Sequence, residues 1–389
     1  MRRSLLLSLP VILLTAVSSW GAEVKLPPPY ATPSATNRPK VIPQPPGAQL
    51  KVPEGFTVEL FAEGFKRARY MVLGPSNEIL LSDSSNAPDG AVYILKPERR
   101  TLIPNLDRPY GLTFWKDYLY VGTTTAVQRY KYDAKKMTVG PAEEILSTKD
   151  FAKGHWTRSV LFDRAGQKMY VAIGSASNVE AGEPEMRAAI NRFNPDGTVH
   201  EIYATGTRNP TAIHWYPGTN TLWAAVQERD ALGDDLVPDF FTSIKQGGFY
   251  GWPYAYIGPN EDPRRKGEKP DLVKKTIVPD VPLGAHVAII DFAFYTGKQF
   301  PAKYQGGAFI AQHGSWNRSK RVGQNVMFIP FKGGKPSGPP EEFLTGWLLS
   351  PDSTEVWGRP VAVMQMPVGS LLVSEDGNNK VYRISYKGK

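Results

Sequence analysis

Hydrophobic and polar residues follow one short pattern that recurs six times between residues 71 and 386. Each copy has a hydrophobic strand, a polar turn and a second β-rich run that ends in glycine, serine or an acidic residue. Paired strands repeated at intervals of roughly 40 to 60 residues are typical of propeller blades. The pattern predicts an all-β fold, a six-bladed β-propeller with almost no helix. The clearest copies are residues 71–83, 111–122, 159–175, 212–226, 306–317 and 362–376.

The composition agrees with many short strands joined by tight turns. The chain of 389 residues contains 36 Gly, 35 Pro and 44 aromatic residues, the last being 9 Trp, 18 Tyr and 17 Phe. This length exceeds the usual limit of a single hydrophobic core, but a propeller grows by adding blades. We therefore expect residues 49–389 to form one domain.

The first 22 residues have the pattern of a signal peptide. Arg2 and Arg3 precede an apolar stretch of 13 residues, Leu5 to Val17, and small residues follow it. Thirteen helical residues are too short for a hydrocarbon core of about 30 Å. The pattern predicts a periplasmic or secreted protein without stable membrane insertion. The absence of cysteine excludes disulfides, thiolate metal ligands and cysteine nucleophiles.

Residues 23–48 are rich in proline, which favours polyproline II and resists regular strands and helices. We interpret them as a tether, a spacer that wraps around or trails the domain, with a docking site for a redox partner as the alternative. The net charge of +9 permits nucleic acid as a partner. Scattered basic residues and the expected export argue against it.

Histidine occurs only five times, so each position is informative. His155 stands in a loop immediately before a blade strand, where an imidazole could accept a proton near neutral pH. A packed or surface histidine is the alternative. His286 and His313 lie at blade edges, whereas His200 and His214 have ordinary strand or turn positions.

Two further segments carry polar groups suited to a ligand. Arg208 and Asn209 precede Pro210 and offer donors to carbonyl or carboxylate oxygens. The acidic segment 226–239 follows the next strand, and its carboxylates and backbone carbonyls suit a hard cation such as Ca²⁺. A solvent-exposed loop is the competing interpretation of that segment. Its carboxylates belong to Glu228, Asp230, Asp234 and Asp235.

Seven motifs in order resemble the soluble quinoprotein glucose/sorbosone dehydrogenase family over about residues 48–386. They are GHWTRSVLF with MYVAIGS, TGTRNPTAI, LWAAVQERDALGDDL, GGFYGWPY, FAFYTG, IAQHGSWNRS and VSEDGNNKVYRI. The sequences QHGSWNRS and ERDALGDDL are most similar to the sorbosone dehydrogenase-like branch. The resemblance implies oxidation of a sugar, either an aldose or a sorbosone-like aldehyde, with pyrroloquinoline quinone (PQQ) and Ca²⁺. It also implies transfer of electrons to an external acceptor such as a periplasmic cytochrome or quinone.

The resemblance implies roles for individual residues. His155 matches the base that takes the sugar hydroxyl proton, and Arg208 the group that stabilises charge on the quinone. Arg208 and Asn209 match the pair that contacts the cofactor. His313 stands where glucose-type relatives carry a lysine for a PQQ carboxylate, and Arg359 matches one of two cofactor-binding arginines.

Three departures from the family pattern affect the expected site. Ser175 stands where an aspartate would orient the histidine, so either Ser175 or Asn178 is expected to orient it. Val361 replaces the second arginine of the last blade. The implied Ca²⁺ ligands are backbone carbonyls near Glu228 and Arg229, beside a one-residue insertion.

Two other functions fit a propeller with this composition. A metal-dependent lactonase would need carboxylate and asparagine ligands from several blades, and a non-catalytic carbohydrate-binding propeller would need only aromatic surfaces. The cluster of His155, Arg208 and Asn209 favours the dehydrogenase. We expect these three residues and His313 to converge at one mouth of the central channel, because equivalent loops of a propeller gather there.

Overall fold

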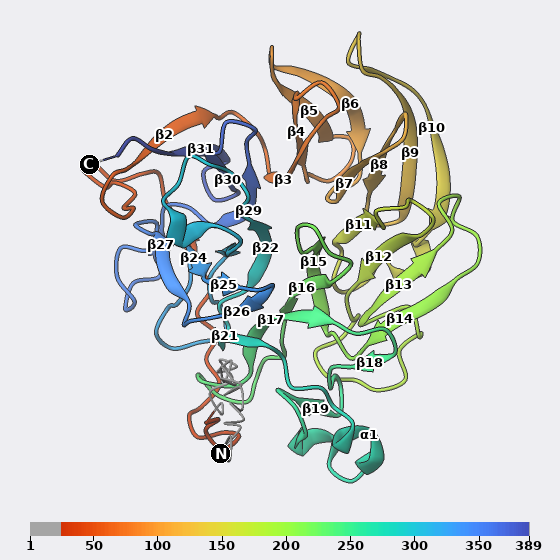
Figure 1. Cartoon of the computed structure of the whole chain (residues 1–389). Helices are drawn as coiled ribbons and strands as arrows, with labels where there is room; N and C mark the ends of the chain where they lie inside the picture. The colour runs from red at the N-terminus through yellow and green to blue at the C-terminus, as the bar shows by residue number, and fades with distance from the viewer. Residues whose placement is uncertain (1–24, 389) are drawn as a thin grey trace, which may run out of the picture.

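A computed structural model describes residues 25–388, which form six four-stranded antiparallel sheets around a central axis (Figure 1). The expected signal peptide, residues 1–22, lies outside the described residues. The first three blades are β3 (Ala68–Leu73), β4 (Ile79–Asp83), β5 (Gly90–Lys96) and β6 (Arg100–Leu106); β7 (Leu112–Trp115), β8 (Tyr118–Gly122), β9 (Ala126–Asp133) and β10 (Thr138–Ser147); β11 (Arg158–Phe162), β12 (Met169–Ile173), β13 (Ala189–Phe193) and β14 (Glu201–Thr205). The last three are β15 (Asn209–Trp215), β16 (Leu222–Gln227), β17 (Pro238–Ile244) and β21 (Val281–Ala285); β22 (Ile289–Phe294), β23 (Ala308–Gln312), β24 (Asn325–Ile329) and β27 (Glu341–Leu344); β29 (Pro360–Gln365), β30 (Leu371–Glu375), β31 (Lys380–Tyr386) and β2 (Phe56–Ala62).

The position of a strand within its blade explains its sequence. Strands β4, β12 and β30 are buried at every position because each lies between neighbouring sheets. A strand covered on both faces has a nearly continuous apolar sequence. The outermost strand β10 is exposed or partly exposed throughout and carries charged residues. The six-bladed propeller expected from the repeat is confirmed.

The ring closes with strands from both ends of the chain. Strand β2 pairs antiparallel with β31, with Phe56 opposite Tyr386, and so completes the sixth blade. The inner strand β29 of that blade packs beside β3 of the first blade. The inner strands β3, β7, β11, β15, β22 and β29 therefore surround the axis (Figure 1).

The fifth blade differs from the expected repeat. The copy at residues 306–317 covers the second strand, β23, and the loop after it, whereas the inner strand is β22. A long loop with a 3₁₀ helix, Ala302–Tyr304, separates the two strands in place of a short polar turn. The repeat pattern therefore identified this blade one strand late.

An insertion lies between β17 and β21. It contains the only α-helix among residues 25–388, α1 (Pro270–Lys274), and a 3₁₀ helix, Pro263–Arg265. Strand β18 (Gly248–Phe249) extends the third blade by pairing parallel with β14, and β19 (Ala255–Tyr256) pairs with β20 (Asn260–Glu261). The remaining short elements are a 3₁₀ helix at Lys149–Phe151 and the hairpin of β25 (Phe331–Lys332) and β26 (Lys335–Pro336). Within the described part of the chain, no helix is long and apolar enough to cross a membrane.

The described part of the proline-rich segment, residues 25–48, lies on the propeller, and we call it the N-terminal strap. Leu26 packs against a hydrophobic cluster of the third and fourth blades. Strand β1 (Lys40–Val41) pairs parallel with β28 (Glu355–Val356), just before the sixth blade. Ile42 packs against the cluster of the fifth and sixth blades. The strap therefore passes from the fourth blade to the sixth.

Candidate active site

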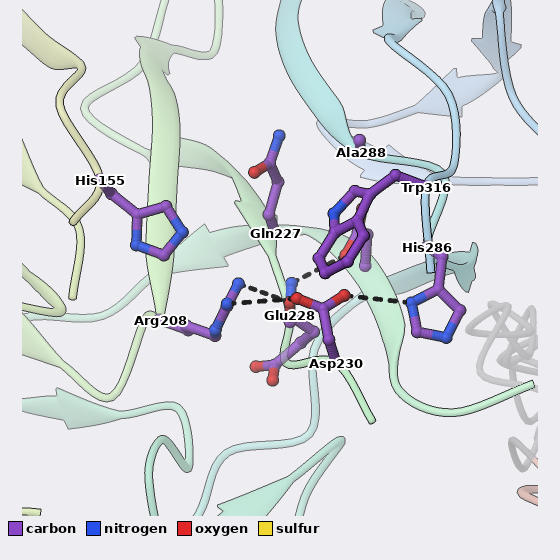
Figure 2. A pocket seen from close by; sticks show the side chains of 9 residues that line it. His155, Arg208, Gln227, Glu228, Asp230, His286, Ala288 and Trp316 are labelled. Atoms are coloured by element: carbon purple, nitrogen blue, oxygen red, sulfur yellow. Dashed lines mark hydrogen bonds and ion pairs between the residues drawn. The ribbon is translucent and has the colours of Figure 1, made fainter. Parts of the chain in front are cut away.

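The polar residues of interest gather at one mouth of the channel because they precede inner strands. His155 precedes β11, Arg208 precedes β15, Arg67 precedes β3 and Arg359 precedes β29. A cavity of about 180 Å³ at this mouth adjoins a wider one of about 580 Å³, and His155, Arg208, Asp230 and Trp316 line both. We call these two cavities together the His155 pocket; Figure 2 shows the residues that line the smaller one.

The backbone fixes the orientation of His155. Its Nδ1 lies 2.8 Å from the carbonyl oxygen of Ser175 and 3.2 Å from the Ser175 hydroxyl. A carbonyl can only accept a hydrogen bond, so Nδ1 carries the proton and Nε2 keeps its lone pair. Burial, followed by the charge of Arg208, lowers the pKa of His155 to about 3. The imidazole is therefore neutral at physiological pH.

Asn178 orients Arg208 rather than His155. Its Oδ1 accepts from the Arg208 Nη2 at 3.2 Å and from the backbone N–H of Asp230 at 2.9 Å. Arg208 also donates from Nε to the Asn178 carbonyl at 3.2 Å and from Nη1 to the Glu228 carbonyl at 2.7 Å. Burial lowers the pKa of Arg208. Most of its donors are already used within the protein, so it offers a ligand mainly positive charge.

Asn209 lies next to His155 and has an unused polar atom. Its Nδ2 donates to Gln227 Oε1 at 2.9 Å, whereas its Oδ1 is buried without a hydrogen-bond partner. A Cβ atom added to Gly174 would lie 2.4 Å from Asn209 Oδ1 and 2.6 Å from the His155 Cβ. Only glycine allows this close approach. An unpaired buried amide oxygen is costly. Asn209 is buried beside His155 and lines neither cavity of the His155 pocket.

The opposite wall contains a second histidine that the sequence did not single out for this pocket. Asp230 lies between Arg208, 3.5 Å away, and His286 Nδ1, 3.4 Å away (Figure 2). His286 Nε2 lies 2.9 Å from the Gly233 carbonyl. Burial disfavours the charged imidazole, but the hydrogen bonds to Asp230 and Gly233 and the charges of Asp230 and Asp239 together outweigh it and raise the pKa of His286. Its position at a blade edge was the only sequence signal.

The carboxylates of the acidic segment do not share a cation site. Asp234 accepts from Ser319 and Asp235 from Arg318, both on another blade. Among residues 25–388, no three or more His, Asp or Glu side chains form a group able to hold a metal ion. The described residues therefore give no support to a Ca²⁺ site made of these side chains.

Glu228 and Arg229 use their side chains to fix the insertion. Arg229 is fully buried and pairs with Glu228 at 2.9 Å and with Asp262 at 3.0 Å. It also donates to the carbonyls of Pro253 and Ala255. Only their backbone carbonyls remain as implied metal ligands, and the Glu228 carbonyl already accepts from Arg208.

His313 and Arg359 line a neighbouring pocket of about 360 Å³, which we call the His313 pocket. His313 Nε2 lies 2.6 Å from Asp376 Oδ1. Burial, followed by the charge of Arg359, lowers the pKa of His313 to about 4. His313 is therefore neutral, and its Nε2–H donates to Asp376. A neutral His313 does not supply the positive charge of the lysine that the resemblance places at this position in glucose-type relatives.

Arginines of the first blade supply positive charge at and near the His313 pocket. Arg67 lines the His313 pocket, and Arg69 donates to Asp376 at 2.5 Å while its Nε is buried without a partner. Both guanidinium groups lie against the ring of Trp156, at 5.4 and 5.3 Å from its centroid. Burial, ahead of the charges of its neighbours, lowers the pKa of Arg359 to about 10. Three arginines thus face a single aspartate.

The structure brings His155, Arg208 and Asn209 together and places His313 and Arg359 beside them at the same mouth. His313 donates its backbone N–H to the carbonyl of Ala288, which lines the His155 pocket. Sequence reasoning missed Arg67, Arg69 and Trp156. Each is a single residue before or within an inner strand, with no motif of its own.

Comparison with known proteins agrees with this fold. An uncharacterized protein of Borreliella burgdorferi is 29% identical over 357 residues, 87% of this chain and 91% of its own length. The calcium structure of a Trichoderma reesei carbohydrate-active enzyme of family AA12 covers 90% of this chain and 99% of its own, with a TM-score of 0.74 and 18% identity. The holo form of the pyranose dehydrogenase PQQ domain from Coprinopsis cinerea covers 88% of this chain and 98% of its own, with a TM-score of 0.73 and 18% identity. At these identities the two structures show the fold alone.

Family models account for most of the propeller. The TrAA12-like model matches residues 265–387. The model of the glucose/sorbosone dehydrogenases matches residues 113–316, just over half of the chain, including His155, Arg208, Asn209 and His313. The chain belongs to the glucose/sorbosone dehydrogenase family.

Proposed function

We propose that this protein oxidises a sugar, an aldose or a sorbosone-like aldehyde, with PQQ as the cofactor and His155 as the base. The family supports an oxidoreductase. The observation that carries the proposal is the geometry of His155: Nδ1 is held by the Ser175 carbonyl, and the neutral ring lines a polar cavity beside buried Arg208.

His155 would accept at Nε2 the proton of a hydroxyl on the carbon that is oxidised, which is the anomeric hydroxyl of a cyclic aldose or a hydroxyl of the hydrated aldehyde. Because the Ser175 carbonyl keeps the other proton on Nδ1, Nε2 is the basic atom. The low pKa ensures that the ring is unprotonated, but it also makes the ring a weak base. An anionic ligand beside Arg208 would offset the positive charge that lowers this pKa, and so strengthen His155 as a base.

Bound PQQ would supply a two-electron acceptor for the hydride that leaves the same substrate carbon. Arg208 would stabilise negative charge that develops on this acceptor, since its guanidinium is buried and held in place by Asn178 and Glu228. The resemblance implies that Asn209 also contacts the cofactor; its Oδ1 lacks a hydrogen-bond partner.

The His313 pocket fits a ligand with several carboxylates. Lys66, Arg67 and Arg359 line it, with Asp376 the one acidic residue of the lining. The unpartnered Arg69 Nε adds a buried donor below it. Val361, where relatives have a second arginine, is fully buried in the core and cannot take part. Arg67 and Arg359 would therefore hold the carboxylates, with Arg69 keeping Asp376 in place.

We include Ca²⁺ in the proposal for two reasons: the resemblance implies it, and a calcium structure of the AA12 enzyme is known. Among residues 25–388 no group of three or more His, Asp or Glu side chains could hold the ion, so backbone carbonyls near Glu228 and Arg229 would have to supply its ligands. Export is a proposal that rests on residues 1–22, outside the described range. Electron transfer to an acceptor such as a periplasmic cytochrome or quinone is a proposal that rests on the resemblance.

Reconstitution tests the function. The purified protein is titrated with PQQ, with and without Ca²⁺, and the quinone absorbance is followed. We then expect D-glucose, D-xylose or L-sorbosone to bleach this absorbance and to reduce an artificial electron acceptor. Protein that binds no PQQ, or binds it without oxidising any sugar of the panel, would contradict the proposal.

A further inference from the structure

The N-terminal strap borders the His155 pocket directly. Ser34 and Thr36 line the wider cavity together with His155, Arg208 and Trp316. Both strap residues are solvent-exposed, so their hydroxyl groups are available to a ligand. This segment reads in the sequence as a proline-rich spacer, yet it supplies part of the wall of the pocket.

Backbone hydrogen bonds fix this part of the strap from the fourth blade. Tyr30 donates its N–H to the carbonyl of Leu232 at 2.8 Å. The hydroxyl of Thr32 accepts from the N–H of Asp234 at 2.7 Å. Both partners lie in the loop between β16 and β17, the same loop that contributes Asp230 to the pocket.

The fifth blade holds the strap from the other side. Asn317 donates its Nδ2 to the carbonyl of Ala35 at 2.5 Å, and Asn37 donates its N–H to the carbonyl of Trp316 at 2.8 Å. Ser34 and Thr36 alternate along the chain with the two anchored residues, Ala35 and Asn37. With Leu26 and Ile42 packed on hydrophobic clusters at the two ends, this stretch of the strap is a fixed wall.

The strap also positions the aromatic residue of the pocket. The Arg38 guanidinium lies 5.7 Å from the centroid of the Trp316 ring. Trp316 is 39% exposed and lines both cavities of the His155 pocket. An exposed indole offers an apolar face to the C–H groups of a sugar ring, while hydroxyl groups offer hydrogen bonds to its O–H groups.

We propose that the strap determines sugar specificity: Ser34 and Thr36 hydrogen-bond the end of the sugar remote from the carbon that is oxidised, while Trp316, held by Asn37 and Arg38, packs against its ring. His155 marks the oxidised end, and the strap residues line the same cavity. This inference rests on the proposed function. It assigns a binding role to a segment outside the six blades.

The test compares the Ser34→Ala/Thr36→Ala double variant with wild-type protein, both loaded with PQQ and Ca²⁺. Loss of two neutral hydrogen bonds made equally in the ground and transition states should raise KM by about tenfold and leave kcat unchanged. The dissociation constant for PQQ, from absorbance titration, should stay at the wild-type value. Thr138→Ala, on the outer strand β10, is the matched control and should change none of these values.

A second variant tests size selection. Ser34→Trp should narrow the cavity and lower kcat/KM more for maltose than for D-glucose, because a disaccharide extends further toward the strap. The elution volume in gel filtration and the PQQ dissociation constant show whether the variant is folded.

The outcomes separate this inference from the proposed function. If wild-type protein binds PQQ and oxidises sugars while the double variant keeps the wild-type KM for every sugar, the strap has no specificity role. Equal losses of kcat/KM for maltose and D-glucose in Ser34→Trp also contradict it. Wild-type protein that does not bind PQQ or oxidise sugars contradicts the proposed function itself.

Discussion

The two pockets at the mouth each contain a neutral histidine, half-buried His155 and buried His313, but the two rings have different partners. His155 rests on the backbone carbonyl of Ser175, whereas His313 rests on the carboxylate of Asp376. Burial lowers both pKa values, to about 3 and about 4. The contact with Ser175 uses Nδ1 of His155 and leaves its Nε2 available to a ligand. The contact with Asp376 uses Nε2 of His313 itself.

The comparison assigns different tasks to the two pockets. The His155 pocket pairs one basic nitrogen with one buried cation, which suits proton abstraction beside a developing negative charge. The His313 pocket holds Arg67 and Arg359 around a histidine that is already paired, which suits binding of carboxylates. A change in the His313 pocket is thus expected to weaken cofactor binding alone. In the His155 pocket, loss of His155 should affect the chemical step alone, whereas Arg208 serves both tasks.

The largest effect should come from His155→Ala. Removing the base should lower turnover by about 10²- to 10⁴-fold, since proton transfer by a positioned side chain contributes about that much. The PQQ dissociation constant should change little, because the His313 pocket is intact. Stopped-flow reduction of bound PQQ by D-glucose measures the chemical step, and absorbance titration measures binding.

His200→Ala is the matched control for that variant. His200 is exposed and hydrogen-bonds Asn191 on the third blade, so its loss should leave turnover at the wild-type level. Near-normal turnover in His155→Ala at saturating PQQ would place the base elsewhere, with His286 the next residue to test.

Arg208→Ala should affect both chemistry and binding. Loss of charge stabilisation should lower turnover by about 10²-fold, and PQQ affinity should fall as well. The positive charge of Arg208 opposes protonation of His155, so its removal raises the pKa of His155, although burial remains the larger cause. The acid limb of the kcat/KM–pH profile should therefore move to higher pH. An unchanged profile would show that His155 is not the titrating base.

Arg359→Met should affect binding alone. A charge-assisted hydrogen bond contributes about 1.5 to 3 kcal/mol, so the PQQ dissociation constant should rise about 10- to 100-fold. Turnover at saturating PQQ should remain near the wild-type value because the His155 pocket is unchanged. Equal losses in affinity and in saturated turnover would mean that the two pockets do not have separate tasks.

The sequence predicts the propeller well because each inner strand pair is a local pattern. Strands such as β4 and β12 are apolar throughout, and their turns are short and polar. The fifth blade was assigned one strand late because a long loop follows β22. The motifs identified His155, Arg208 and Asn209 because these loops directly precede strands and share one end of the channel.

The residues missed from the sequence depend on contacts between distant parts of the chain. Arg69 meets Asp376 only because β2 and β31 close the ring and bring the first blade beside the sixth. The strap is held by backbone hydrogen bonds and by isolated apolar residues such as Leu26, which leave no periodic signal. Its proline content predicts an extended chain but not the surface on which it lies.

The smallest effect should come from Ser175→Ala, which tests how His155 is oriented. The hydroxyl lies 3.2 Å from Nδ1, farther than the carbonyl at 2.8 Å, and it donates to the Ser177 carbonyl rather than to the ring. The substitution removes the hydroxyl and leaves the carbonyl in place. Turnover should therefore fall by less than about threefold, since less than one neutral hydrogen bond is lost at the ring. A loss of about 10²-fold, measured by the same stopped-flow assay, would show that the side chain and not the backbone fixes the tautomer of His155. In that case the family's aspartate would have a functional substitute in the serine hydroxyl, and the contrast between the carbonyl-held and carboxylate-held histidines would fail.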